Sequence, residues 1–175
     1  MPISKQMLTG FGAAAAILGG SLRVISTFVP YTPDSPGLEL LYGSVDILML
    51  FGLMTLYASV SRLLGWTGFA GFVLAATSLA SIVGPDPNRF GINFYEAGAA
   101  GLLVGLALLA GALLKHRLLQ PAALLWLAAL ASALIGILSS LTLAVTFAGL
   151  LLGLGFAAAG FQLNNSSAGR ARAQR

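Results

Sequence analysis

The chain alternates between long apolar runs and short breaks that are polar or rich in proline. An α-helix needs about 20 mostly apolar residues to cross the roughly 30 Å hydrocarbon core of a bilayer. Six runs approach or reach that length, at residues 7–29, 38–60, 66–83, 97–114, 121–138 and 141–163. The pattern therefore predicts an all-α, polytopic membrane protein in which residues 1–163 form one bundle of six transmembrane helices.

The breaks between these runs differ in strength. Proline-rich breaks follow the first and third runs, at residues 30–36 and 84–89, and a basic break at residues 115–117 follows the fourth. The weakest break is Ser139-Ser140, between the last two runs. An alternative with five helices, in which the last two runs form one long bent helix, therefore stays open.

Composition identifies the solvent and excludes several kinds of chemistry. Hydrophobic residues make up 58% of the 175 residues and charged residues only 8%, whereas a water-soluble domain carries roughly 25% charged residues. The bilayer is therefore the first expected partner. Because the chain has no cysteine and one histidine, His116, it cannot by itself form disulfides, Cys/His zinc sites, iron–sulfur clusters or bis-histidine haem, and we expect no cofactor. The net charge of +4 is too scattered to indicate nucleic-acid binding.

Basic residues orient the bundle, because positively charged short loops stay in the cytoplasm. With the N-terminus inside, one basic residue falls outside, Arg89, and one within a run, Arg23. The others fall on the cytoplasmic side: Lys5, Arg62, Lys115, Arg117, Arg170, Arg172 and Arg175. We expect a multi-pass protein of the inner (plasma) membrane with both termini cytoplasmic and residues 164–175 forming a disordered basic tail. A cleaved signal peptide is the alternative for residues 1–29, but the apolar run is long for one.

Glycines recur inside the runs and suggest close helix packing. In lipid, small residues let helix backbones approach each other. We expect this role for Gly12, Gly19, Gly101, Gly105, Gly149 and Gly153, within the bundle or, as the alternative, in a homo-oligomer. A Gly-Leu pair also recurs near the middle of the second, fourth and sixth runs. It suggests three repeated helical hairpins, although chance recurrence of Gly and Leu explains it equally well.

Two charged residues lie inside the runs, where each costs about 2.5 to 3.5 kcal/mol at a helix centre. Arg23 lies roughly 9 Å below the outer end of the first run, and Asp46 roughly 12 Å below the outer end of the second. Because consecutive helices joined by a short loop are usually antiparallel neighbours, the sequence predicts an ion pair between the two.

Further polar residues extend this group toward the outer surface. Glu39, Tyr42 and Asp46 share one helix face, and Tyr95 and Glu96 begin the fourth run on the same side. One interpretation is an ion pair that fixes the register of two helices. Another is an outward-opening pocket in which Arg23 binds an anionic or carbonyl-bearing ligand. In a third, Arg23 extends toward the interface.

Three segments resemble a known kind of protein: residues 41–57, LYGSVDILMLFGLMTLY; residues 62–72, RLLGWTGFAGF; and residues 153–160, GLGFAAAG. They resemble uncharacterised small bacterial inner-membrane proteins with about six helices. The resemblance implies a fold but no activity and no site residue. Length and topology are also similar to the vitamin-binding subunits of energy-coupling-factor importers, although no local motif of that family is present.

These observations favour a non-enzymatic function. Membrane enzymes usually carry a dense set of acids, histidines or nucleophiles, and the chain shows no such set. We expect an accessory or structural subunit that docks on a membrane-protein partner through its Gly/Ala faces. The alternative is a protein that binds or helps transport a small ligand through Arg23, Asp46 and Glu96. The scarcity of polar residues in the last three runs favours the first.

Overall fold

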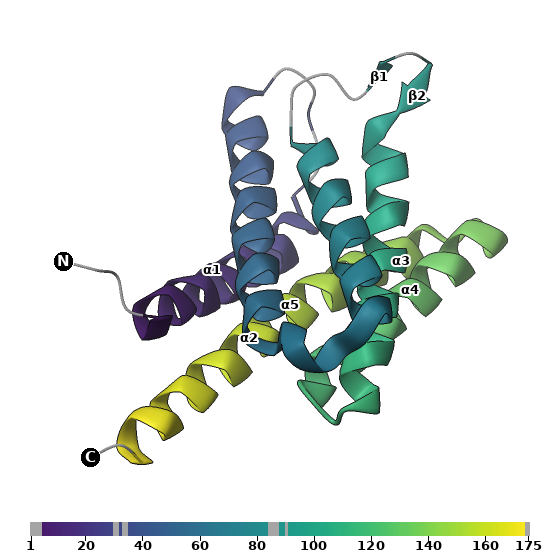
Figure 1. Cartoon of the computed structure of the whole chain (residues 1–175). Coiled ribbons are helices and arrows are strands. Elements are labelled where there is room, and N and C mark those ends of the chain that lie inside the picture. Colours follow the sequence, from purple (N-terminus) through teal and green to yellow (C-terminus); the bar gives the residue numbers. More distant parts are fainter. Residues whose placement is uncertain (1–4, 30–31, 33–34, 84–87, 90, 174–175) are drawn as a thin grey trace.

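The structure is a computed structural model that describes residues 5–29, 32, 35–83, 88–89 and 91–173. This part of the chain forms five helices and one short hairpin (Figure 1): α1 Lys5–Ser26, α2 Pro36–Ile82, β1 Asn88–Arg89, β2 Ile92–Asn93, α3 Phe94–Lys115, α4 Gln120–Ser139 and α5 Thr142–Ala173. All five helices are long and apolar enough to cross a membrane. The prediction of a helical chain, with helices long and apolar enough to span a membrane, is confirmed.

Helix α2 covers the second predicted run and nearly all of the third, with one interruption between them. A straight helix of its 47 residues would be about 70 Å long. Its backbone instead leaves the helical region at Gly65, with φ 60° and ψ −163°. Tyr57 and Phe72 would lie about 22 Å apart along a straight helix, yet their stacked rings are 4.1 Å apart. The chain therefore folds back at Gly65, and the two halves of α2 lie side by side (Figure 1).

The last two predicted runs do not form one long bent helix, as the alternative with five helices required. Helix α4 ends at Ser139, and Ser140 adopts a left-handed conformation with φ 53°. The backbone N–H of Leu141 then donates to Gly136 O at 3.0 Å, and α5 begins at Thr142. Serine seldom adopts the left-handed conformation. A real break can therefore be as short as these two serines.

Glycines lie where helices approach most closely. A Cβ atom at Gly105 would lie 2.5 Å from Ala75 N, and one at Gly153 would lie 2.6 Å from Gly20 O. Gly19 faces Met49 N at 2.9 Å in the same sense. The other three expected packing glycines also face side chains of this chain: Gly12 faces Thr55, Gly101 faces Ser78 and Gly149 faces Thr27. These six glycines therefore serve contacts within the chain, and their faces are not open to a partner.

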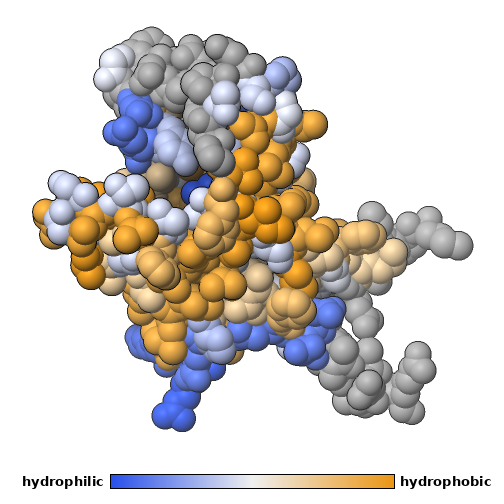
Figure 2. All heavy atoms as spheres, turned by 180° about the vertical axis from the view of Figure 1, so that it is seen from behind, coloured by the Kyte–Doolittle hydropathy of each residue, from blue (hydrophilic) through white to orange (hydrophobic). Residues whose placement is uncertain are grey.

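Apolar side chains cover much of the surface as well as the core. Seen from behind, a broad hydrophobic surface crosses the middle of the molecule, and hydrophilic atoms gather along its lower edge (Figure 2). Figure 1 places the bend of α2 and the connection from α3 to α4 at that lower end. Arg62, Lys115, His116 and Arg117 are exposed there, and we call these four residues the basic end.

Helix α5 continues past the predicted end of the last run, at residue 163, to Ala173. Alanine and arginine, which dominate residues 168–173, are among the best helix formers.

Candidate functional site

Arg23 lies in the last turn of α1, where a helix leaves carbonyl groups without partners within the helix. Its own carbonyl oxygen accepts hydrogen bonds from Ser26 Oγ at 3.0 Å and from Thr27 Oγ1 at 2.8 Å. The backbone N–H of Thr27 donates to the same oxygen at 3.1 Å. Local side chains thus complete the end of α1, and they hold the residues around Arg23 in a defined conformation.

Tyr42 connects this helix end to α2. Its hydroxyl group donates to two backbone carbonyl oxygens, Ser26 O at 3.3 Å and Val29 O at 3.2 Å. Ser26 is the last residue of α1 and Val29 follows it three positions later. Polar groups in an apolar surrounding are costly without a partner. Tyr42 therefore fixes the end of α1 against the first half of α2.

The guanidinium group of Arg23 is incompletely paired. Its Nε atom is buried and has no hydrogen-bond partner in the described part of the chain. The Nη2 atom lies 3.9 Å from the position that a Cβ atom would take at Gly149 of α5. Arg23 is only half-buried as a whole. The side chain therefore extends into the contact between α1 and α5 with one donor still unused.

A second buried donor has different surroundings. Trp126 Nε1 also has no partner among the described residues. Its ring packs against Phe156, with centroids 5.3 Å apart, and lies over Gly155. No polar side chain takes part in these contacts. Arg23 is therefore the stronger candidate for ligand binding, because its neighbours are polar.

Asp46 lies half-buried on α2 and interacts electrostatically with Arg23. The described side chains of the two residues nevertheless form no ion pair within 4.0 Å. The predicted pair is thus present as two opposite charges near each other but not in contact. We call Arg23, Ser26, Thr27, Tyr42 and Asp46 the polar cluster.

The remaining expected site residues do not join the cluster. Glu39 is exposed on α2, one turn before Tyr42 and thus beyond the end of α1. Tyr95 and Glu96 are exposed in the first turn of α3, which packs on the second half of α2. A negative charge there interacts favourably with the helix dipole. Their backbone N–H groups donate to Asn93 Oδ1, which caps α3. The sequence signal for this cap is Asn93 followed three positions later by Glu96.

The arrangement contains groups that can bind a polar ligand. Arginine donates through a planar fork that matches carboxylate and phosphate groups, and a carboxylate such as Asp46 accepts hydrogen bonds. Across the described residues, no three His, Asp or Glu side chains gather where they would hold a metal ion. Comparisons of the chain with protein-family models, curated proteins and solved structures found no match.

Proposed function

We propose that this protein is a multi-pass plasma-membrane protein that binds a small anionic or carbonyl-bearing ligand in the polar cluster. The observation that supports the proposal is the buried Nε donor of Arg23, which has no partner although Asp46 lies near enough to interact with it. A buried donor without a partner costs roughly 1 to 3 kcal/mol, and more when it is charged. A ligand that accepts this hydrogen bond would remove the cost.

The ligand would have two functional groups. A carboxylate, phosphate or carbonyl oxygen would accept from Arg23 Nε. A hydroxyl or amine on the same molecule would donate to Asp46. Tyr42, Ser26 and Thr27 act indirectly, because their hydrogen bonds hold the end of α1. The cluster would thus select a molecule that carries, close together, an acceptor for Arg23 and a donor for Asp46.

Native mass spectrometry of protein extracted from its own membrane in mild detergent tests this binding. The wild type should carry a bound small mass, and Arg23→Gln should lose it. Arg23→Lys should retain it in part, because the charge remains but the planar fork is lost. Equal amounts of the same mass on the wild type and on Arg23→Gln would refute the proposal.

We also propose six membrane crossings with both termini in the cytoplasm. The fold at Gly65 gives α2 two apolar halves, and the basic end gathers charges that the positive-inside rule assigns to the cytoplasm. Because the chain has no cysteine, single cysteines give a clean test. A membrane-impermeant maleimide should label Gly37→Cys in intact cells, but should label Gln120→Cys only after permeabilisation. The reverse pattern would invert the topology.

A second candidate function is an accessory subunit that docks through the tip formed by the end of α4 and the start of α5. This tip projects from the other helices (Figure 1). Its apolar side chains are unusually exposed: Ile137 by 71%, Leu138 by 86% and Leu143 by 72%. Replacing Leu138 and Leu143 with Gln should remove a co-purifying polypeptide, whereas Phe11→Gln, at a 70% exposed site on α1, should not. Extraction of a lone chain in mild detergent would reject this candidate.

A further inference from the structure

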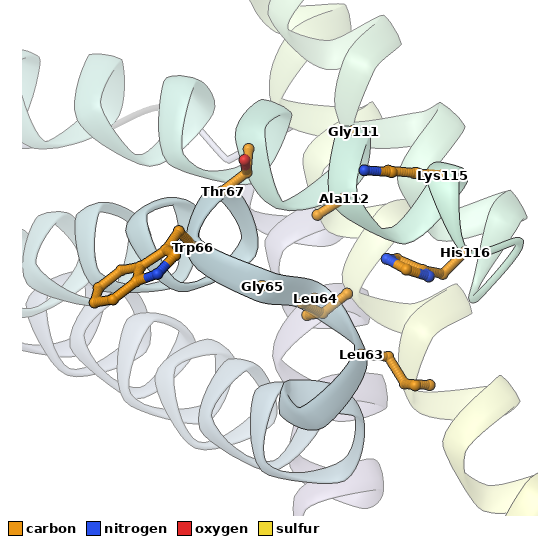
Figure 3. Close-up of a pocket in the computed structure, with 9 residues that line it drawn as sticks. All are labelled: Leu63, Leu64, Gly65, Trp66, Thr67, Gly111, Ala112, Lys115 and His116. Atoms are coloured by element: carbon orange, nitrogen blue, oxygen red, sulfur yellow. The ribbon is translucent and has the colours of Figure 1, made fainter.

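A hollow opens at the basic end, away from the polar cluster. It has a volume of about 250 Å³ and lies between residues 63–67, at the bend of α2, and the last turns of α3. Figure 3 shows Lys115 and His116 extending from the end of α3 toward the bend, while the Trp66 side chain points away from them. This volume is smaller than the roughly 300 to 1,000 Å³ of pockets for drug-sized ligands.

Two glycines keep the hollow open. A Cβ atom at Gly65 or at Gly111 would meet nothing within 4 Å. Gly71 and Gly105, on the same two helices, would instead place a Cβ atom within 2.6 Å of a backbone nitrogen. Close packing therefore explains Gly71 and Gly105 but does not explain Gly111. An unfilled space beside Gly111 is what a bound group would require.

The basic side of the hollow is formed by Lys115 and His116, from the end of α3. Arg62 and Arg117 are exposed at the same end of the molecule but do not line the hollow. The acidic side chains that the structure describes lie elsewhere: Glu39 and Asp46 in the first half of α2, and Glu96 in the first turn of α3. The cations at this end therefore lack an acidic partner within the described chain.

Apolar groups border the same hollow. Leu64 and Ala112 form a buried floor, with exposed fractions of 3% and 5%. Leu63 and Trp66 flank it and are 53% and 86% exposed. Exposed tryptophan is typical of the interface between lipid and water. A group bound here would have its polar part at Lys115 and His116, with apolar surface beside it.

We propose that this hollow binds the phosphate of an anionic membrane phospholipid, with the lipid chains lying against Leu63 and Trp66. Basic pockets between membrane helices on the cytoplasmic side bind such headgroups. A free phosphate has the same charged group but no chains, so it would not use the apolar border. The site is separate from the polar cluster, and the inference goes beyond the proposed function.

The test compares the binding of phosphatidylglycerol and phosphatidylcholine by the full chain, using native mass spectrometry of protein delipidated in neutral detergent. Phosphatidylglycerol should bind better. Lys115→Gln should weaken its binding about fivefold, because it removes the lysine that lines the hollow. Gly111→Leu keeps every charge but fills the hollow, and should weaken binding at least as much. Arg62→Gln removes one charge at the same end outside the hollow, and should change binding less than twofold.

Each other outcome contradicts the proposal. Equal losses in Lys115→Gln and Arg62→Gln would indicate general attraction to a basic surface rather than a site. Unchanged binding by Gly111→Leu, with the variant still monodisperse and cooperatively folded, would show that the hollow is not occupied. Inorganic phosphate that displaces phosphatidylglycerol at a comparable concentration would assign the site to a soluble phosphate compound and overturn the lipid assignment.

Discussion

The polar cluster and the basic end both contain positive charge, but their surroundings differ. In the polar cluster, Tyr42, Ser26 and Thr27 hydrogen-bond to backbone carbonyl groups, and one buried donor of Arg23 stays unused. At the basic end, the charged side chains are exposed around a hollow that has no acidic side chain among its lining residues. The first arrangement offers one buried donor between helices, whereas the second offers exposed basic side chains beside a hollow.

Glycines on α2 and α3 also differ in their surroundings. Gly71 and Gly105 face backbone atoms across the contact between α2 and α3, whereas Gly65 and Gly111 face open space. The residue type alone therefore does not reveal its role. What a Cβ atom would meet distinguishes a glycine that serves packing from one that faces open space.

The largest expected effect is that of Gly105→Leu. The new side chain would meet Ala75 N and Gly71 O, which belong to the backbone and cannot move aside. We expect a loss of more than about 3 kcal/mol, at or beyond the usual range for overpacking. Recovery of monodisperse protein and the thermal midpoint in detergent measure it. The matched variant Gly111→Leu should unfold close to the wild-type midpoint. An equal fall of the midpoint in both variants would contradict the difference between a packed Gly105 and an open Gly111.

Coupling between Arg23 and Asp46 should be the next largest effect. Arg23→Leu and Asp46→Leu should each destabilise the protein, because each leaves the opposite charge without compensation. The double variant should be better tolerated than the sum of the two, with a coupling energy of about 0.5 to 1 kcal/mol. A thermal-unfolding cycle in detergent measures this coupling. Strictly additive shifts would mean that the two charges act independently.

Removal of the Tyr42 hydroxyl should have a smaller effect. Tyr42→Phe keeps the ring but leaves the carbonyl groups of Ser26 and Val29 without this donor. A loss of about 1 kcal/mol is expected, which lowers the midpoint by roughly 2 to 4 °C for a chain of this size. Tyr95→Phe is the control, because the Tyr95 side chain is 48% exposed. A similar shift for both variants would remove the special role of Tyr42.

The smallest effect on stability is expected for Gly111→Ala, and its sign is opposite. Alanine favours a helix interior over glycine by up to about 1 kcal/mol, and the new methyl group would meet nothing within 4 Å. The thermal midpoint should therefore stay the same or rise slightly. Gly71→Ala is the counterpart, and it should lower the midpoint because its Cβ atom would lie 2.6 Å from Leu109 N. A lower midpoint for Gly111→Ala would show that this position is packed.

Much of the fold was predictable, because a helix in lipid must be apolar over a fixed length. Hydropathy located both short interruptions, between residues 60 and 66 and at residues 139–140. It did not predict their backbone conformations, which are a positive φ at Gly65 and a left-handed Ser140.

The candidate site was predictable only in part. The similar depths of Arg23 and Asp46 in their runs correctly predicted that the two residues lie near each other. The shared helix face of Glu39, Tyr42 and Asp46 did not predict that α1 ends too early to cover Glu39. The hollow at the basic end was missed, because His116 appears in the sequence as a lone interfacial histidine. Its proximity to Gly65 requires the fold of α2 and α3 together.

The most direct test compares bound masses on three proteins by native mass spectrometry after extraction from the source membrane: the wild type, Arg23→Gln and Lys115→Gln. Two separate sites predict that Arg23→Gln loses a small bound molecule and keeps phospholipid, whereas Lys115→Gln keeps the small molecule and binds less anionic phospholipid. If both variants lose the same species, or if the wild type carries no small molecule, the assignment of a small ligand to the polar cluster is wrong.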